Sequence, residues 1–270
     1  MLRRFFRVLA HASAGCRALV LAGFCASGLL GAPTHAQAPD SDIVIYTESY
    51  PPYSYLTREG KMDGLSTRLV RRLMDETGLK YRIVLVPWTR AYRATLEEDN
   101  ALIFTIARSE GREDLFEWLV QLGSIKFQLY ARQEDNRFDN EINWNKAGYR
   151  IACLVDDISC LLVKGLNVPE QYIYRIAEVN RPDVTLVLAG RADLYVAEKI
   201  HNLYRLKALG VPADSLKAVK TLDAGGDLFL ASGLGLKPEL RAAVLAAQAR
   251  LQAAGVAMTL DAADLENLPE

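Results

Sequence analysis

The chain has 270 residues, 50% of them hydrophobic and 24% charged, and its 32 basic and 33 acidic residues give a net charge of −1. The first acidic residue is Asp40, so without residues 1–36 and their four arginines the balance is 28 basic to 33 acidic residues. This balance excludes a strongly basic nucleic-acid-binding protein, and the length allows one large or two small α/β domains.

Residues 1–36 are typical of a secretory signal peptide. A basic start is followed by the apolar run Ala18–Ala32, which is shorter than a membrane-spanning helix. We expect cleavage after Ala36, because a cut after Ala38 would leave Pro39 at the new N-terminus. The alternative is an uncleaved anchor helix. With cleavage, the protein is expected in the periplasm.

Strands and helices alternate along the first half of the remaining chain. Leu65, Leu69 and Leu73 recur at helical spacing, and Gly78 is typical of the position just after a helix. The pattern predicts strands at 43–47, 81–86, 101–106 and 124–131, and helices at 65–77 and 89–98.

A polar stretch, RQEDNRFDNEINWNKAGY, separates this half from a second alternating series. There the pattern predicts strands at 149–155, 172–176, 193–196 and 227–232, and helices at 159–165, 182–189, 198–209 and 238–254. Alternation at this spacing is typical of parallel sheets, and the polar stretch indicates two lobes.

Aromatic and basic residues follow several predicted strands, and open α/β sheets bind ligands at the carboxyl ends of their strands. The turn SYPPYSY follows the first strand, and its prolines can hold Tyr50 rigidly over a ligand. At least one of Tyr50, Tyr53 and Tyr55 is expected in the core, and Tyr55 is the first candidate. Trp88 and Arg90 follow another strand in PWTRAY, although Trp88 can equally pack as an aromatic between the lobes.

Outside residues 1–36 the chain has two cysteines, Cys153 and Cys160, in IACLVDDISC. In an oxidising compartment such a pair can form a disulfide across a strand-to-helix turn. The alternative is two buried thiols. Since the one histidine in this part of the chain is His201, no metal site is expected, and no cofactor either.

The segment IVIYTESYPPYSYLTREGKMDGLSTRLVRRLMDETG resembles the opening of family-3 extracytoplasmic solute-binding proteins, which serve polar amino-acid ABC importers. Three later segments agree in order: IARSEGRED with FEW, AGRADLYVAEK, and LFLASGLGLKPELRAAVLAAQARLQAAG. Together these segments span nearly all of the chain after residue 36.

The resemblance implies a two-lobed type II periplasmic-binding-protein-like fold, with two parallel or mixed sheets joined by two crossover strands. Lobe 1 would comprise residues 40–130 and 228–270, and lobe 2 residues 131–227. Hinge closure on a ligand would bend the chain near Tyr130–Ala131 and Asp227–Leu230. The expected partners are a small-molecule ligand and an inner-membrane ABC permease, and the protein is expected to be a monomer.

The resemblance places Arg112 at the arginine whose guanidinium binds the ligand carboxylate, a geometry that allows two parallel hydrogen bonds. The alternative is an ion pair with Glu113, Asp114 or Glu117 on a solvated helix. Arg108 departs from the family pattern, and it either makes the site more attractive to anions or replaces Arg112 as the anchor. Thr105 adds a hydroxyl at the strand end, or is simply a β-branched strand residue.

In the second lobe, Asp157 and Ser159 belong to a strand-to-helix turn, where helix N–H groups can bind an anion or the side chains can cap the helix. The resemblance implies an acidic partner for a ligand ammonium at Ala197. Ordinary α-amino-acid recognition therefore needs Glu198, Asp156 or Asp157 to supply that charge.

We expect a non-catalytic solute-binding protein. One alternative is an exported enzyme on the same fold, similar to cyclohexadienyl dehydratase, with Glu48, Glu198 or Asp156 as its acid or base. Another is a periplasmic sensory receptor for a membrane kinase.

Overall fold

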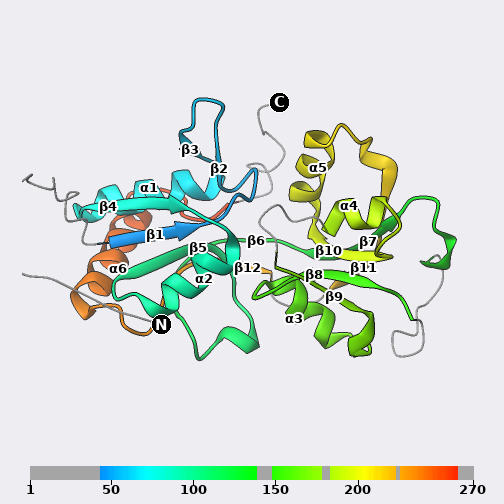
Figure 1. Ribbon diagram of the computed structural model, residues 1–270. Helices are drawn as coiled ribbons and strands as arrows, with labels where there is room; N and C mark the ends of the chain where they lie inside the picture. The colour runs from blue at the N-terminus through cyan, green and yellow to red at the C-terminus, as the bar shows by residue number, and fades with distance from the viewer. Residues whose placement is uncertain (1–42, 139–147, 178–182, 223–225, 261–270) are drawn as a thin grey trace, which may run out of the picture. The chain divides into compact units, whose positions relative to one another are not determined.

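The computed structural model describes residues 43–138, 148–177, 183–222 and 226–260, and residues 40–270 form one compact unit. Within the described residues, the strands form two five-stranded sheets and one two-stranded hairpin (Figure 1). The signal peptide predicted at 1–36 lies outside the described residues. None of the helices described is both long and apolar enough to span a membrane.

The first sheet has the strand order β4-β1-β5-β12-β6. Its strands are β1 (Ile43–Thr47), β4 (Tyr81–Leu85), β5 (Ala101–Ala107), β6 (Glu117–Ser124) and β12 (Asp227–Ser232). β1 runs parallel to β4 and β5, whereas β12 runs antiparallel to β5 and β6. The sheet is therefore mixed.

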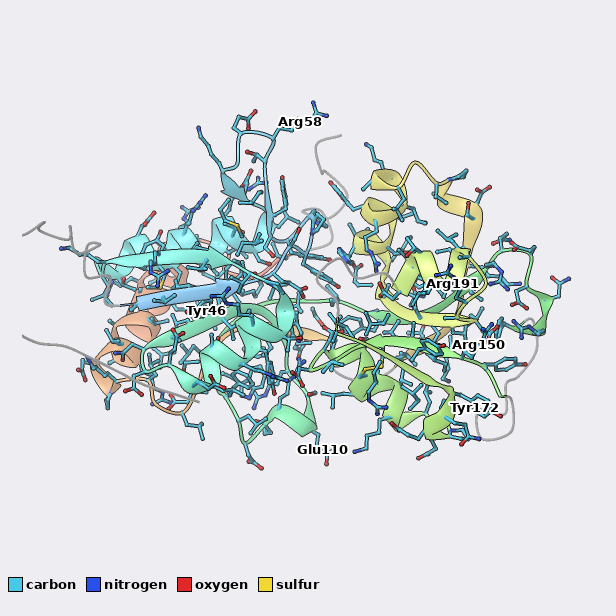
Figure 2. All side chains as sticks on the ribbon, viewed as in Figure 1. Tyr46, Arg58, Glu110, Arg150, Tyr172 and Arg191 are labelled. Carbon is cyan, nitrogen blue, oxygen red and sulfur yellow. A yellow bond between two sulfur atoms is a disulfide. The ribbon has the colours of Figure 1, made fainter. Side chains whose placement is uncertain are left out.

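Helices α1 (Leu65–Thr77) and α6 (Pro238–Ala253) cover one face of the first sheet, and α2 (Trp88–Glu97) covers the other. The side chains of β1 alternate accordingly: Ile43 and Ile45 pack with α1 and α6, and Tyr46 belongs to the cluster of α2. The hairpin of β2 (Tyr55–Leu56) and β3 (Met62–Asp63) carries Arg58 at its tip, pointing away from the sheet (Figure 2).

The second sheet has the strand order β11-β7-β10-β8-β9. Its strands are β7 (Phe127–Arg132), β8 (Ile151–Leu154), β9 (Ile173–Ile176), β10 (Leu194–Glu198) and β11 (Leu216–Leu222). α3 (Ile158–Gly165) packs on one face, and α4 (Asp183–Leu188) and α5 (Lys199–Ala208) pack on the other. Four short 3₁₀ helices within the described residues are η1 (Glu110–Arg112), η2 (Asn136–Phe138), η3 (Glu170–Tyr172) and η4 (Ala213–Ser215).

Two strands of the five-stranded sheets, β6 and β11, are missing from the sequence-based prediction. β6 pairs antiparallel with β12, and β11 pairs antiparallel with β7. The alternation of strands and helices predicts parallel strands and does not reveal these two. The chain passes from β6 to β7 through Ile125 and Lys126, and the N–H of Ile125 donates to the carbonyl of Gly226 (2.8 Å). Tyr130–Ala131, the expected hinge, lies inside β7, because the apolar sequence from Phe127 onward continues a buried strand.

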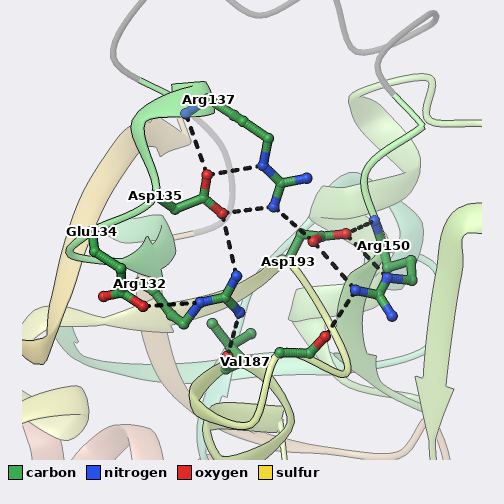
Figure 3. Close-up of polar contacts among 8 residues, drawn as sticks. Arg132, Glu134, Asp135, Arg137, Arg150, Val187 and Asp193 are labelled. Carbon is green, nitrogen blue, oxygen red and sulfur yellow. Dashed lines mark hydrogen bonds and ion pairs between the residues drawn. The ribbon is translucent and has the colours of Figure 1, made fainter.

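An ion-pair network connects the ends of the three central strands of the second sheet, β7, β10 and β8 (Figure 3). Asp193 accepts hydrogen bonds from the Arg150 backbone N–H (2.8 Å) and from Arg137 Nη2 (2.8 Å), and Arg137 also binds Asp135 (2.6 Å). Burial alone would raise the pKa of Asp193, but the hydrogen bonds from Arg150 and Arg137 outweigh it and lower this pKa. The network thus stabilises the start of β10, whose far end reaches the candidate site.

Candidate functional site

A small cavity of about 20 Å³ lies where strands of both sheets end. The lining residues on the first-sheet side are Glu48, Tyr50, Trp88, Thr105, Ala107, Arg112 and Leu228. Ile125, just before β7, and Phe127, its first residue, also line the cavity. The lining residues on the second-sheet side are Asp157, Ile158, Ser159, Val196, Ala197, His201 and Arg205. The parallel strands β1, β5, β8 and β10 all point their carboxyl ends at this cavity, which is where open α/β sheets bind ligands.

Arg112 is the largest side chain that is almost fully buried, with 1% of its surface exposed. It stands at the end of η1, after β5, and its guanidinium donates to the carbonyls of Ala107 (2.9 Å) and Asp156 (2.8 Å). The guanidinium also lies 5.3 Å from the ring centre of Trp88 and 5.4 Å from that of Tyr92, within cation–π range.

The burial of the Arg112 guanidinium is compensated only in part by the charged groups around it. Burial lowers the pKa of its guanidinium, and the attraction of Asp157, Tyr92 and Glu48 offsets this only in part. The two carbonyl acceptors are neutral and do not cancel the positive charge. A carboxylate bound here would compensate the buried cation through charge-assisted hydrogen bonds.

The turn between β8 and α3 forms the opposite side of the cavity. Asp157 is the N-cap of α3, and its Oδ1 accepts a hydrogen bond from the Ser159 N–H (2.9 Å). Ser159 Oγ in turn accepts from the N–H of Leu154 (3.0 Å). Both side chains line the cavity while they cap the turn, so the N-terminus of α3 already carries a carboxylate of the chain itself.

Asp156 connects this turn to the first-sheet side. Its carbonyl accepts from Trp88 Nε1 and from Arg112 Nη2, both at 2.8 Å, and its carboxylate pairs with Arg93 (3.1 Å). Cys153 and Cys160, which flank the turn, are joined by a disulfide with Cα atoms 4.9 Å apart.

Glu198 ends β10 and caps α5 from outside the cavity lining. Its carboxylate accepts from the N–H groups of Ile200 and His201 (both 2.8 Å) and from the Tyr53 hydroxyl (3.2 Å). Burial raises the pKa of the Glu198 carboxyl, and these hydrogen bonds lower it less than burial raises it. Ala197, which does line the cavity, contributes only a methyl group.

His201 and Tyr50 form an aromatic stack against the cavity, with ring centres 3.9 Å apart. The Nδ1 of His201 lies 2.8 Å from the carbonyl oxygen of Pro51. Because a carbonyl can only accept, this nitrogen carries the proton. Tyr53 also stacks on Tyr50, with ring centres 5.4 Å apart, so the Tyr-Pro-Pro-Tyr turn is fixed against α5.

Thr105 has an unusual backbone. Its φ of 60° lies in the left-handed region, and the ladder of β5 with β12 skips it, pairing Phe104 and Ile106 with adjacent residues of β12. A β-branched residue rarely adopts this conformation. Its Oγ1 is buried, has no hydrogen-bond partner among the described residues, and belongs to the cavity lining.

The structure brings six of the nine predicted ligand-binding residues to the cavity lining, namely Tyr50, Trp88, Thr105, Arg112, Asp157 and Ser159. The other three are placed elsewhere. Arg90 is exposed on α2, Glu198 caps α5, and Arg108 pairs with Glu113 on the surface through Nε (2.9 Å). Glu113, one of the three acidic partners considered for Arg112, therefore pairs with Arg108 instead.

Sequence reasoning did not select His201, Arg205 or Phe127, which also line the cavity. His201 and Arg205 lie four residues apart on α5, the helix that follows β10. Their position just after the carboxyl end of a strand is the signal by which the sequence could have revealed them as site residues. Arg205 also pairs with Asp183, with Nη1 3.2 Å from Oδ2. Phe127 carried no such signal, because it begins a strand in an apolar stretch.

Across the four described ranges, no cluster of three or more histidine, cysteine, aspartate or glutamate side chains could hold a metal ion. The chemistry that the cavity offers is that of a buried cation, nearby carboxylates, hydroxyl groups and aromatic faces. These groups recognise polar organic solutes by charge and hydrogen bonding.

Two mixed sheets with helices on both faces and a cavity at their strand ends define a two-lobed periplasmic-binding-protein-like fold. Residues 43–261 match the model of the bacterial extracellular solute-binding proteins, family 3, and the chain belongs to this family. A search of the curated proteins found no match.

Solved structures with the same fold include proteins of two kinds. A periplasmic His/Glu/Gln/Arg/opine family-binding protein from Silicibacter pomeroyi, in complex with lysine, has a TM-score of 0.61 at 17% identity, over 79% of this chain and 92% of that one. The arginine-, lysine-, histidine-binding protein ArtJ from Geobacillus stearothermophilus has a TM-score of 0.65 at 17% identity, covering 79% and 90%. A histidine kinase sensor domain has a TM-score of 0.63 at 21% identity, covering 79% and 91%.

Proposed function

We propose that the protein is a non-catalytic periplasmic solute-binding protein that captures a small polar or carboxylate-bearing, amino-acid-like solute between its two lobes. As a monomer it delivers this solute to an inner-membrane ABC permease, and residues 1–36 direct its export. The observation that carries the proposal is Arg112, a buried guanidinium in a cavity lined from both sheets. Family membership supports the same role.

The charges of the cavity favour a solute with a carboxylate at one end. The Arg112 guanidinium donates hydrogen bonds to that carboxylate, and the Thr105 hydroxyl is a further donor. On the opposite side Asp157 supplies the negative charge for an ammonium group, because Ala197 is uncharged and the Glu198 carboxylate is directed to α5 and Tyr53. Tyr50 and Trp88 provide the aromatic faces that hold the solute between them.

The size of the cavity supports binding by hinge motion. A volume of about 20 Å³ holds about one water molecule, so an amino-acid-sized solute enters only when the two sides of the cavity separate. The contacts that must open include the Trp88 and Arg112 hydrogen bonds to Asp156 and the Tyr53 hydrogen bond to Glu198.

A thermal-shift screen of the protein lacking residues 1–36 tests the proposal. Each α-amino acid is compared with its decarboxylated amine and its deaminated acid, together with dicarboxylates and polyamines. A solute at 100 times its Kd should stabilise the protein by about 2.7 kcal/mol, which raises the Tm by several degrees. If the amines shift the Tm as much as the amino acids, Arg112 is not a carboxylate anchor. If no solute shifts it, the proposed solute class is wrong.

A sensory role is the second candidate, since one neighbour of this fold is a histidine kinase sensor domain. The two roles differ in the cell: deleting an importer component abolishes uptake of the solute, whereas deleting a sensor changes gene expression and leaves uptake intact. The enzyme alternative is tested separately by incubating the protein with prephenate and arogenate. Turnover of either compound would overturn the non-catalytic role.

A further inference from the structure

The segment Cys153–Cys160, here called the disulfide-closed turn, begins in β8 and ends in α3. Its two end residues are joined by the disulfide, and between them lie four residues that build the candidate site: Asp156, Asp157, Ile158 and Ser159. The bond therefore closes a short ring of chain around one side of the cavity.

The backbone of this turn has a conformation that needs support. Asp156 has a φ of 61°, in the left-handed region that residues other than glycine rarely adopt. The N–H of Asp157 bonds back to the carbonyl of Leu154 (3.2 Å), and the N–H of Val155 bonds to the carbonyl of Ile176 (2.9 Å). The first bond restrains the Asp156–Asp157 peptide group, which carries the Asp156 carbonyl, and the second restrains the peptide group between Leu154 and Val155.

The left-handed turn presents the Asp156 carbonyl to the first-sheet side, where two donors meet it. Trp88 Nε1 and Arg112 Nη2 each donate at 2.8 Å, and both side chains line the cavity. Arg93 pairs with the carboxylate of the same residue at 3.1 Å. A rotation of this one peptide group would thus disturb the anion anchor and an aromatic face together.

The elements on either side of the turn do not need the disulfide to stay packed. Cys153 is fully buried beside Ile151, and Ile158, Leu162 and Val163 of α3 belong to the same hydrophobic cluster. Loss of the bond would therefore relax mainly the residues between the cysteines.

We propose that the Cys153–Cys160 disulfide is a positioning element of the candidate site. It holds the Asp156 carbonyl in place for Arg112 and Trp88 and thereby sets the affinity for the solute. Cleavage by a dithiol, which supplies two electrons and two protons and leaves two thiols, weakens solute binding while both sheets stay folded. The affinity part of this proposal rests on the proposed function, and the geometric part does not.

Three forms of the protein test the proposal: oxidised wild type, wild type reduced with dithiothreitol, and Cys153→Ala/Cys160→Ala. The first readout needs no solute. In an ¹⁵N-labelled sample the indole N–H signal of Trp88, assigned with Trp88→Phe, should shift when the disulfide is lost, while that of Trp118 on β6 stays. Circular dichroism and urea unfolding show whether the fold persists.

The second readout is calorimetric titration with the solute that gives the largest shift in the thermal screen. We expect affinity to fall about tenfold in both disulfide-free forms, as for a weakened hydrogen bond to a charged group. An unmoved Trp88 signal overturns the geometric claim, and unchanged affinity overturns the effect on binding. Unfolding of both disulfide-free forms would show that the bond maintains the fold instead. If no solute binds, the proposed function fails, and the Trp88 signal still decides the geometry.

Discussion

The guanidinium of Arg112 donates a hydrogen bond of 2.8 Å to the backbone carbonyl of Asp156, which joins the segment after β5 to the turn after β8. Arg108, four residues earlier, points instead to Glu113 at the surface. The two arginines of IARSEGR therefore have different roles, and the first prediction separates them.

Arg112→Lys should weaken solute binding about 10- to 100-fold, because lysine keeps the charge but loses the planar fork that binds a carboxylate with two hydrogen bonds. Arg108→Lys is the matched control and should change affinity less than about twofold, since exposed ion pairs contribute at most about 1 kcal/mol. Calorimetric titration of both variants shows which of the two arginines binds the solute. A loss of affinity only in Arg108→Lys would show that Arg108, and not Arg112, binds the carboxylate.

Asp157→Asn should lower affinity for solutes with an ammonium group and leave dicarboxylate binding unchanged or stronger. Asparagine caps a helix about as well as aspartate, so the variant removes the charge and keeps the turn that Asp157 makes with Ser159. Titrating the variant with an α-amino acid and with its deaminated acid measures the difference. Equal losses for the two solutes would show that Asp157 does not recognise the ammonium group.

Thr105→Val should keep or raise stability by up to about 1 kcal/mol while it lowers solute affinity. The Thr105 hydroxyl is buried and has no partner among the described residues, so its removal costs the folded chain nothing, whereas a bound solute loses a donor. Thr105→Ser retains the hydroxyl and should retain affinity. Urea unfolding measures the stability of both variants, and calorimetric titration measures their affinity for the solute. If Thr105→Val binds the solute as tightly as wild type, Thr105 is a structural residue of the strand and does not bind the solute.

The Tm of Glu198→Gln relative to wild type should rise between acid and neutral pH. Burial raises the pKa of the Glu198 carboxyl above its ordinary value of 4.5, so its protonated form favours folding. That contribution is complete below the unfolded-state pKa and is lost as the pH rises through the folded-state pKa. Glutamine stays neutral at every pH, and its single amide oxygen can accept from His201 and Tyr53 while the bond from the Ile200 N–H is lost. The difference in Tm between the two proteins, measured from about pH 4 to about pH 7.5, should therefore increase with pH; a constant difference would contradict the raised pKa.

Gly64→Ala should destabilise the protein strongly and loosen the Tyr50–Tyr53 turn. Gly64 has a φ of +127°, and a Cβ there would lie 2.3 Å from the backbone oxygen of Tyr53. Gly60→Ala is the control: its φ is +73°, no atom lies within 4 Å of the new Cβ, and it should cost only about 1 kcal/mol. Urea unfolding compares the two variants. If both variants lose a similarly small amount of unfolding free energy, the backbone around Gly64 adjusts easily to the added Cβ.

Local sequence pattern was sufficient for the helices and for most strands. The helix predicted at 65–77 has those bounds, and Gly78 ends it with a φ of 70° and an N–H bonded to Asp75, because this capping depends on residues a few positions apart. The strand at 43–47 follows equally from its own apolar residues. β6 could not be found in this way, since the register shifts in its ladder with β12 interrupt the alternation of buried and exposed residues.

The sequence by itself determined the two-lobed α/β fold, the family and the strand ends at which the candidate site lies. It left open whether Arg112 points into the site or forms an ion pair on a solvated helix, and whether Asp157 caps a helix or lines the cavity. The tertiary structure decided these questions: η1 turns Arg112 inward to the carbonyls of Ala107 and Asp156, while Asp157 does both. The physical reason is that burial and electrostatics depend on groups brought together from both sheets, which no local pattern encodes.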